Sequence, residues 1–227
     1  MLRIALLFSL LLFSLLARAE PEPYNRVDFQ VEAAREVAND LLLATMSVEI
    51  QDKQPASVAQ QLNTRLNDAL KKAAAFSTVK ASSGNQNTYP VYGKNNQIDA
   101  WRGHGEIRLK SRDFKAVGEL IMQLQAGMQL TGLQFSVAPD TSAQTENALI
   151  AEAIRAFQSR AEAIQKIAGA TSYKTVHYSI SSGGMPPVYP VAMMRNRAMA
   201  DAAIPAPEFS GGESRMTVQI NGTIELH

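Results

Sequence analysis

The feature that most constrains the fold is the spacing of hydrophobic residues, which changes repeatedly between two periods from residue 24 onward. A period of two predicts half-buried strands, and spacings of three and four predict helices that bury one face. Strands are expected at residues 27–33, 42–50, 101–110, 133–137, 176–180 and 216–226, and helices at residues 58–73, 114–124 and 142–168. The total is about seven mostly antiparallel strands with three helices packed on the sheet, an α+β fold.

Two segments leave alternatives open. The polar stretch 82–96 is either a long loop or a loosely paired hairpin, because it is rich in turn-forming residues. Asn221-Gly222 is a hairpin signal inside the last strand, but a two-residue turn there would mix the polar and apolar faces of the strand. We therefore predict that the last strand runs straight through Gly222, and that Asn39-Asp40 forms a hairpin turn between the first two strands.

The helix ends carry recognisable capping residues. Ser57 is a candidate N-cap of the first helix, and Asp113 in the first turn of the second suits the positive end of its dipole. Thr141 and Gln144 stand at the spacing of a capping box, and Gly169 is the expected stop of the long third helix.

The first nineteen residues predict export. One arginine precedes a 13-residue apolar run, and Ala17-Arg18-Ala19 is an A-x-A cleavage site, so residues 1–19 form a secretory signal peptide. The run is too short to cross a bilayer, and no transmembrane segment is expected in the mature chain, residues 20–227. An uncleaved N-terminal anchor is the alternative. The expected location is the periplasm.

Charge and cysteine content exclude several classes of function. The chain has 22 basic and 21 acidic residues without a basic block, so nucleic acid is not an expected partner. It has no cysteine, which excludes disulfides, a cysteine zinc site and a thiol nucleophile.

None of the three histidines, His104, His177 and His227, has another histidine or a carboxylate at the helical spacing of a metal site. His104 is expected on the polar face of its strand, in a cross-strand polar contact, and His177 on the face opposite its apolar neighbours. His227 ends the chain, where fraying is expected. We predict no catalytic residues, no cofactor and no metal site among them.

Known catalytic motifs are also missing from the sequence, including the nucleophile elbow of hydrolases. Gly103-His104-Gly105 is half of a dinucleotide fingerprint, but it lies inside a predicted strand rather than after one. The two glycines instead favour the close approach of a helix or a neighbouring backbone.

A segment rich in glycine, proline, alanine and methionine, residues 182–212, precedes the last strand. It holds four of the nine methionines, Met185, Met193, Met194 and Met199. Flexible methionines favour an adaptable contact with a neighbouring subunit. Exported thioethers can also bind Cu(I) or consume oxidant, which makes these four residues the only candidate metal or redox site.

The order of these parts resembles the SIMPL-domain family of exported bacterial proteins, which includes the periplasmic immunogenic proteins. The resemblance rests on the Arg112-Asp113 helix start, the strand at residues 130–135, the long helix 142–168 and the loop before the final strand. It spans the mature chain and implies a single SIMPL-like domain at residues 20–227.

Members of this family resemble envelope proteins linked to stress tolerance, some of which assemble into large oligomers. The resemblance implies no catalytic residues. We therefore expect a non-enzymatic periplasmic homo-oligomer that supports envelope integrity or oxidative stress tolerance and contacts the envelope. The alternative is a small-molecule, Cu(I) or oxidant binder that uses the methionine loop; a hydrolase whose residues meet only in the folded chain is the third hypothesis.

Overall fold

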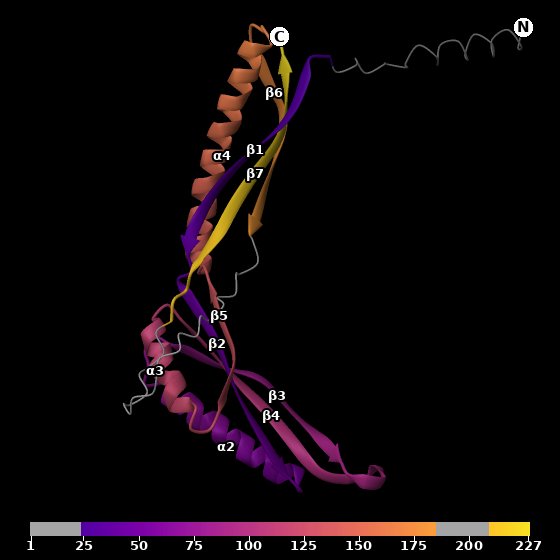
Figure 1. The fold of residues 1–227 in the computed structure, drawn as a ribbon, viewed down its shortest axis with the longest axis vertical. Coiled ribbons are helices and arrows are strands. Elements are labelled where there is room, and N and C mark those ends of the chain that lie inside the picture. Colours follow the sequence, from indigo (N-terminus) through magenta and orange to yellow (C-terminus); the bar gives the residue numbers. More distant parts are fainter. Residues whose placement is uncertain (1–23, 185–208) are drawn as a thin grey trace, which may run out of the picture. The chain divides into compact units, whose positions relative to one another are not determined.

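A computed structural model of the chain describes residues 24–184 and 209–227 and confirms the predicted α+β fold (Figure 1). The strands are β1 (Arg26–Ala38), β2 (Leu41–Asp52), β3 (Lys80–Tyr92), β4 (Ile98–Ser111), β5 (Gln129–Ser136), β6 (Tyr173–Gly184) and β7 (Glu213–Leu226). The helices are α2 (Pro55–Ala73), α3 (Phe114–Leu124) and α4 (Pro139–Ile167), with a short 3-10 turn at Lys94–Asn96.

The strands form two antiparallel sheets, one of three strands in the order β1-β7-β6 and one of four in the order β3-β4-β2-β5. The described chain also divides into two compact units. The first unit holds residues 24–32, 153–181 and 219–227, and the second holds residues 33–152, 182–184 and 209–218. The prediction of one domain over residues 20–227 stays a prediction.

In the second unit, α2 packs on β4, and glycines make this possible. A Cβ atom on Gly103 would lie 2.5 Å from Val58 Cγ1, and one on Gly105 would lie 3.0 Å from a methyl carbon of Leu62. The Gly103-His104-Gly105 sequence is therefore a helix-packing surface, as expected from its position inside a strand. Leu66 continues the buried face of α2 one turn further.

The N-terminus of α2 differs from the prediction. The helix begins at Pro55, whose fixed φ suits the first turn, and its N-cap position is Gln54 rather than Ser57. The Ser57 hydroxyl instead donates a 2.9 Å hydrogen bond to Asp52, which also accepts from the Gln54 N–H. The Ser57 cap was wrong because a proline at the first helical position moved the boundary three residues earlier.

Strands β2 and β5 and helix α3 complete the core of this unit. Asp113 is the N-cap of α3, and its carboxylate accepts from the Ala116 N–H at 3.0 Å. Large aliphatic side chains fill the space between α2, α3 and the sheet, including the fully buried Leu42, Met46, Leu62, Ile107, Leu109, Leu120 and Ile121.

The polar stretch 82–96 is largely strand, which decides between its two alternatives. Lys80–Tyr92 pairs with β4 along its length, and the register shifts between Ser83 and Gln86. Polar residues are tolerated there because β3 is an edge strand whose side chains are mostly exposed. The hairpin alternative is therefore confirmed and the loop alternative is wrong.

The predicted hairpin turn at Asn39-Asp40 is also wrong, because β1 and β2 belong to different sheets. Asn39 bonds to the segment before β7 instead. Its amide donates to the Gly211 carbonyl at 2.8 Å, its carbonyl oxygen accepts from the Ser214 hydroxyl, and its backbone N–H donates to the Gly212 carbonyl. Asn39 therefore lies in the connection between strands of two different sheets, not in a turn between two paired strands.

Asp40 holds the start of α4. Its carboxylate accepts from the Ala138 N–H at 2.6 Å and from the Thr141 hydroxyl at 2.7 Å, and Arg112 lies 3.6 Å away. Burial alone would raise the pKa of Asp40, but these hydrogen bonds and the Arg112 charge together lower it. The helix begins at Pro139, so Thr141 lies inside its first turn and the predicted capping box was wrong.

The far end of α4 and its buried face follow the sequence more closely. Gly169 adopts a left-handed φ of 71°, which confirms it as the helix stop. Spacings of three and four predict a buried face made of Ile150, Ile154, Phe157, Ala161, Ile164 and Ala168, and the observed face is rotated slightly from it. Phe157 and Ala161 are buried as expected, but Ile150, Ile154 and Ile164 are only half-buried, Ala168 is exposed, and Leu149 and Ala153 take the central positions.

In the first unit, β7 runs straight between β1 and β6 and passes through Gly222 without a turn, as predicted. The reason is tertiary packing: a Cβ atom on Gly222 would lie 2.5 Å from the ring of Phe157 in α4. That ring stacks on Phe29 of β1 with centroids 4.6 Å apart. The glycine therefore admits an aromatic ring instead of turning the chain.

Candidate functional site

The open face of the four-stranded sheet carries a small polar cluster around His104. The helix-facing side of β4 is glycine and aliphatic, so His104 and Glu106 point to the opposite side. His104 Nε2 lies 3.1 Å from Glu106 Oε1, and His104 Nδ1 lies 3.9 Å from Glu49 Oε1 on β2, the residue directly opposite in the sheet. His104 thus makes the polar contacts that the sequence predicted.

The contact with His104 also affects the acidity of Glu106. The hydrogen bond from His104, together with one from the Asn85 backbone, lowers the pKa of Glu106 below its usual value. The two carboxylates approach different nitrogens of the imidazole ring, so one ion cannot bind all three groups at once. Within residues 24–184 and 209–227, no group of three histidine or acidic side chains is placed to hold a metal ion.

A hollow of about 430 Å³ adjoins this cluster, beside the turn that leads from α3 into β5. Its lining is polar, with Ser47, Glu49, His104 and Gln129 among the contributors. A second hollow of about 340 Å³ lies on the other side of the same turn, against α2. Gly127 and Met128 line both hollows.

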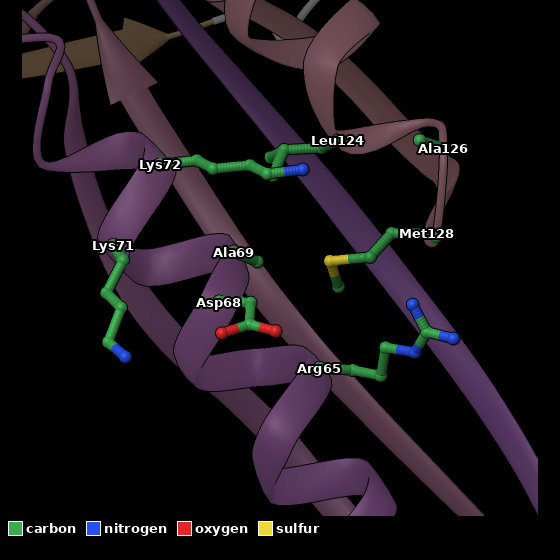
Figure 2. Close-up of a pocket in the computed structure, with 9 residues that line it drawn as sticks. Arg65, Asp68, Ala69, Lys71, Lys72, Leu124, Ala126 and Met128 are labelled. Atoms are coloured by element: carbon green, nitrogen blue, oxygen red, sulfur yellow. The ribbon is translucent and has the colours of Figure 1, made fainter.

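The second hollow is basic. Figure 2 shows Lys72 and Arg65 reaching from α2 toward the turn, while Lys71 points away and Asp68 lies between them. The Lys72 ammonium donates to the Gln123 carbonyl at 3.4 Å. All four charged side chains are exposed, so the hollow is a solvated surface feature.

The remaining histidines lie apart from this cluster. His177 of β6 lines a hollow of about 300 Å³ with Asp28, Asn221 and Thr223, on the polar side of the three-stranded sheet. The Thr223 hydroxyl donates to the Asp28 carboxylate there. His227 is held rather than frayed, because its backbone bonds to Thr171 and Ser172 at 2.7 to 3.2 Å.

The sequence singled out residues that the structure does not describe. Met185, Met193, Met194 and Met199 lie outside the described residues, and so do Ala17 and Ala19 of the cleavage site. A methionine site for Cu(I) or oxidant stays a prediction, and Cu(I) titration of a variant with all four methionines changed to leucine tests it.

One candidate surface was not identified from the sequence. Val176, Tyr178 and Ile180 form one row on β6, here called the β6 apolar row, and they are 40%, 47% and 40% exposed. The row lies on the face that α4 covers, since the Tyr178 ring lies 5.8 Å from that of Phe157. Alternation predicted the strand, but only the fold shows that a single helix leaves its edge open.

None of the helices in the described segments is long and apolar enough to span a membrane. Figure 1 shows α4, the longest of them, and its face opposite the sheet is polar.

Comparison with known proteins gives the family. The SIMPL family, described as a protein of unknown function (DUF541), matches residues 27–224. The chain therefore belongs to the SIMPL family, as its sequence pattern indicated. The search of curated proteins finds no match.

Four chains of solved structures are matched. One is described as "The crystal structure of AtUAH in complex with glyoxylate". It is 15% identical, with a TM-score of 0.31, and the match covers 45% of this chain and 28% of that one. A likeness of that size carries no argument about function.

Proposed function

We propose that this chain is an exported, non-enzymatic protein that assembles with copies of itself in the periplasm and supports envelope integrity or stress tolerance. The observation that carries the proposal is the β6 apolar row, three large apolar side chains exposed along one open strand. Exposed apolar surface of this kind, next to unpaired backbone groups, favours association with another protein.

Two further observations support the proposal. Membership of the SIMPL family agrees with the resemblance to envelope proteins, some of which form oligomers. The signal-like residues 1–19 support export, because a charged start, a short apolar run and an A-x-A site are what a signal peptidase substrate requires. The proposal assigns no reaction, since no catalytic motif was found in the sequence.

Light scattering on the mature chain tests assembly. Residues 20–227, run through size exclusion at micromolar concentration, are expected to give a mass of two or more chains. A monomer at that concentration contradicts the proposal. A second protein, with residues 185–208 replaced by a glycine-serine sequence of equal length, tests the sequence-based prediction that the methionine loop takes part in assembly.

Export and envelope function need separate measurements. Mass spectrometry of protein recovered from the periplasm is expected to show a chain that begins at Glu20. A strain lacking the gene is expected to lose tolerance to oxidant or detergent, and to regain it with the wild-type chain but not with a chain that stays monomeric. Full rescue by the monomeric chain would separate the stress role from assembly.

A further inference from the structure

The four edge strands of the two sheets differ in how well they are protected against pairing with another chain. Edge strands in natural proteins are blunted by charges, prolines, bulges or short length. β1 carries five charged residues in thirteen. β3 carries a proline and an irregular register, and β5 is only eight residues long with a register irregularity opposite Thr45.

β6 has none of these devices over most of its length. Among its twelve residues it carries one permanently charged side chain, Lys174, and no proline. It pairs with β7 on one side, and no described strand pairs with its other side. β6 therefore has both an unprotected edge and a row of exposed apolar side chains. None of the other three edge strands has both features.

We propose that β6 pairs antiparallel with β6 of a second copy of this chain, with Tyr178 on the two-fold axis. This inference rests on the proposed self-assembly and names its interface. In this register Tyr178 lies opposite Tyr178 of the partner subunit, and Val176 lies opposite Ile180 of the partner subunit. The two three-stranded sheets then join into one, with both β6 apolar rows on the same face.

The side chains select this register over its neighbours. A shift by one pair toward the start of the strand sets Ile180 opposite Lys174, and a shift the other way sets Val176 opposite Ser182. An odd shift places the apolar rows on opposite faces, because side chains alternate along a strand. Only the proposed register keeps all three apolar side chains against apolar partners.

Charge complementarity also supports it. The proposed register sets Lys174 opposite Ser182 of the partner subunit. The Ser182 hydroxyl donates to the Glu146 carboxylate of α4, so the lysine of one copy arrives beside an acid of the other. On the opposite face of β6, His177 lies opposite Ser179 of the partner subunit, which makes a polar pair on the polar side of the sheet.

Cysteine cross-linking tests the register, because the chain has no cysteine of its own. Under mild oxidation Y178C is expected to form a disulfide-linked dimer, since directly opposite residues have Cβ atoms about 5 Å apart. V176C and I180C alone are expected not to cross-link, because each lies about 13 Å along the strand from its own copy. Mixing these two proteins is expected to give a V176C–I180C heterodimer.

Charge substitution gives an independent test. V176K and I180E are each expected to weaken self-association roughly tenfold or more. Mixing them restores it, because the new lysine of one copy then lies opposite the new glutamate of the other. Q30K, which adds the same charge to the exposed face of β1, is the control and leaves association unchanged. Thermal unfolding by circular dichroism verifies that each variant is folded.

The outcomes separate this inference from the proposed function. An oligomer by light scattering that gives no cross-link at position 178, or cross-links best at another β6 position, overturns the β6 pairing while self-assembly stands. A cross-link that appears only after residues 185–208 are replaced shows that this chain's own segment occupies β6, and also overturns it. A monomeric wild-type chain overturns both.

Discussion

In both units a helix packs closely against a strand, but the side chains at the contact differ. In each, a helix approaches a strand closely because the strand has glycine at the contact. In the second unit the groups above Gly105 are leucine methyls, which can rotate away. In the first unit the group above Gly222 is the Phe157 ring, with Phe29 stacked on it and Tyr178 beside it. The leucine side chains can move to accept a Cβ atom added at the glycine. The Phe157 ring cannot, because it is in contact with two other rings.

The aromatic packing also explains why β6 is open. One helix covers three strands in the first unit, and its central ring lies over β7 and β1. The β6 apolar row therefore receives cover on one side only, whereas α2 and α3 together bury the aliphatic side chains on one face of the four-stranded sheet. The less completely covered sheet is the one for which we propose pairing with a second copy.

The largest effect is expected from removing the central ring. Phe157→Ala should destabilise the mature chain by about 4 kcal/mol, because a buried phenylalanine is replaced by a cavity that its stacked neighbours cannot fill. Leu62→Ala, the matched change under the four-stranded sheet, should cost about 3 kcal/mol. Urea unfolding monitored by circular dichroism measures both. A loss below 1 kcal/mol for Phe157→Ala would show that its ring does not hold the first unit together.

The glycines sharpen the comparison. Gly222→Ala is expected to cost about 3 kcal/mol, since the added Cβ meets a ring that cannot move, and Gly105→Ala about 1 kcal/mol, since two leucines can adjust. Gly132→Ala is the control, because its Cβ would lie 3.5 Å from Thr45, an ordinary contact. Equal losses at 222 and 105 would contradict the distinction between rigid and flexible contacts.

The helix starts extend the comparison to polar groups. Both α2 and α4 begin with a proline, but the aspartate at the start of α2 is the nearby Asp52, whereas α4 depends on Asp40 from a distant part of the chain. Asp40→Ala should therefore cost about 1 to 2 kcal/mol, the usual value of a lost helix cap. Asp40→Asn keeps the hydrogen-bond acceptor and removes the charge, so it should cost less.

This effect should depend on pH in a defined direction. The folded-state pKa of Asp40 is lowered, so its charge stabilises the fold fully above the ordinary aspartate pKa of about 3.9. The stabilisation is lost as the pH falls through the lower, folded-state pKa. The stability difference between wild type and Asp40→Asn, measured by urea unfolding from pH 7 to pH 3, should be constant at first and shrink at the acid end. A difference that grows toward low pH contradicts this assignment.

The smallest effect is expected at the polar cluster on the open face of the four-stranded sheet. His104→Gln should change stability by less than about 1 kcal/mol, because its partners are charged groups near solvent. The same urea measurement applies, with Arg102→Gln on the same face as the control. A loss of 2 kcal/mol or more would mean that the cluster is part of the packed structure.

Local patterns predicted elements well where the physical cause was local. Alternation located β1, β2, β4, β5, β6 and β7, and spacings of three and four located all three helices. The straight course of β7 through Asn221-Gly222 was predicted only from the requirement that its apolar side chains stay on one face of the strand. Asp113 and Gly169 acted at the ends of their helices because capping involves only neighbouring backbone groups.

The Ser57 cap failed for a local reason, the proline at position 55, but two other predictions failed because a distant group was decisive. Asn39 looked like a turn residue, but its bonds go to Gly211 and Ser214, more than 170 positions away. Thr141 was predicted to be the N-cap of α4, but its hydroxyl donates to Asp40. The Asp40 carboxylate also accepts from the Ala138 N–H and so takes the place of the predicted cap. No local pattern carries that information, because the partner is brought there only by the sheets.

By itself, the sequence determined the fold class, all the elements except β3, and the SIMPL family, because periodicity and capping depend on neighbouring residues. Only the tertiary structure decided which strands share a sheet, why glycines stand at positions 103, 105 and 222, and which strand edge is left open. These depend on contacts between segments far apart in the chain. The exposed row on β6 is such a property, since burial is decided by what else packs nearby.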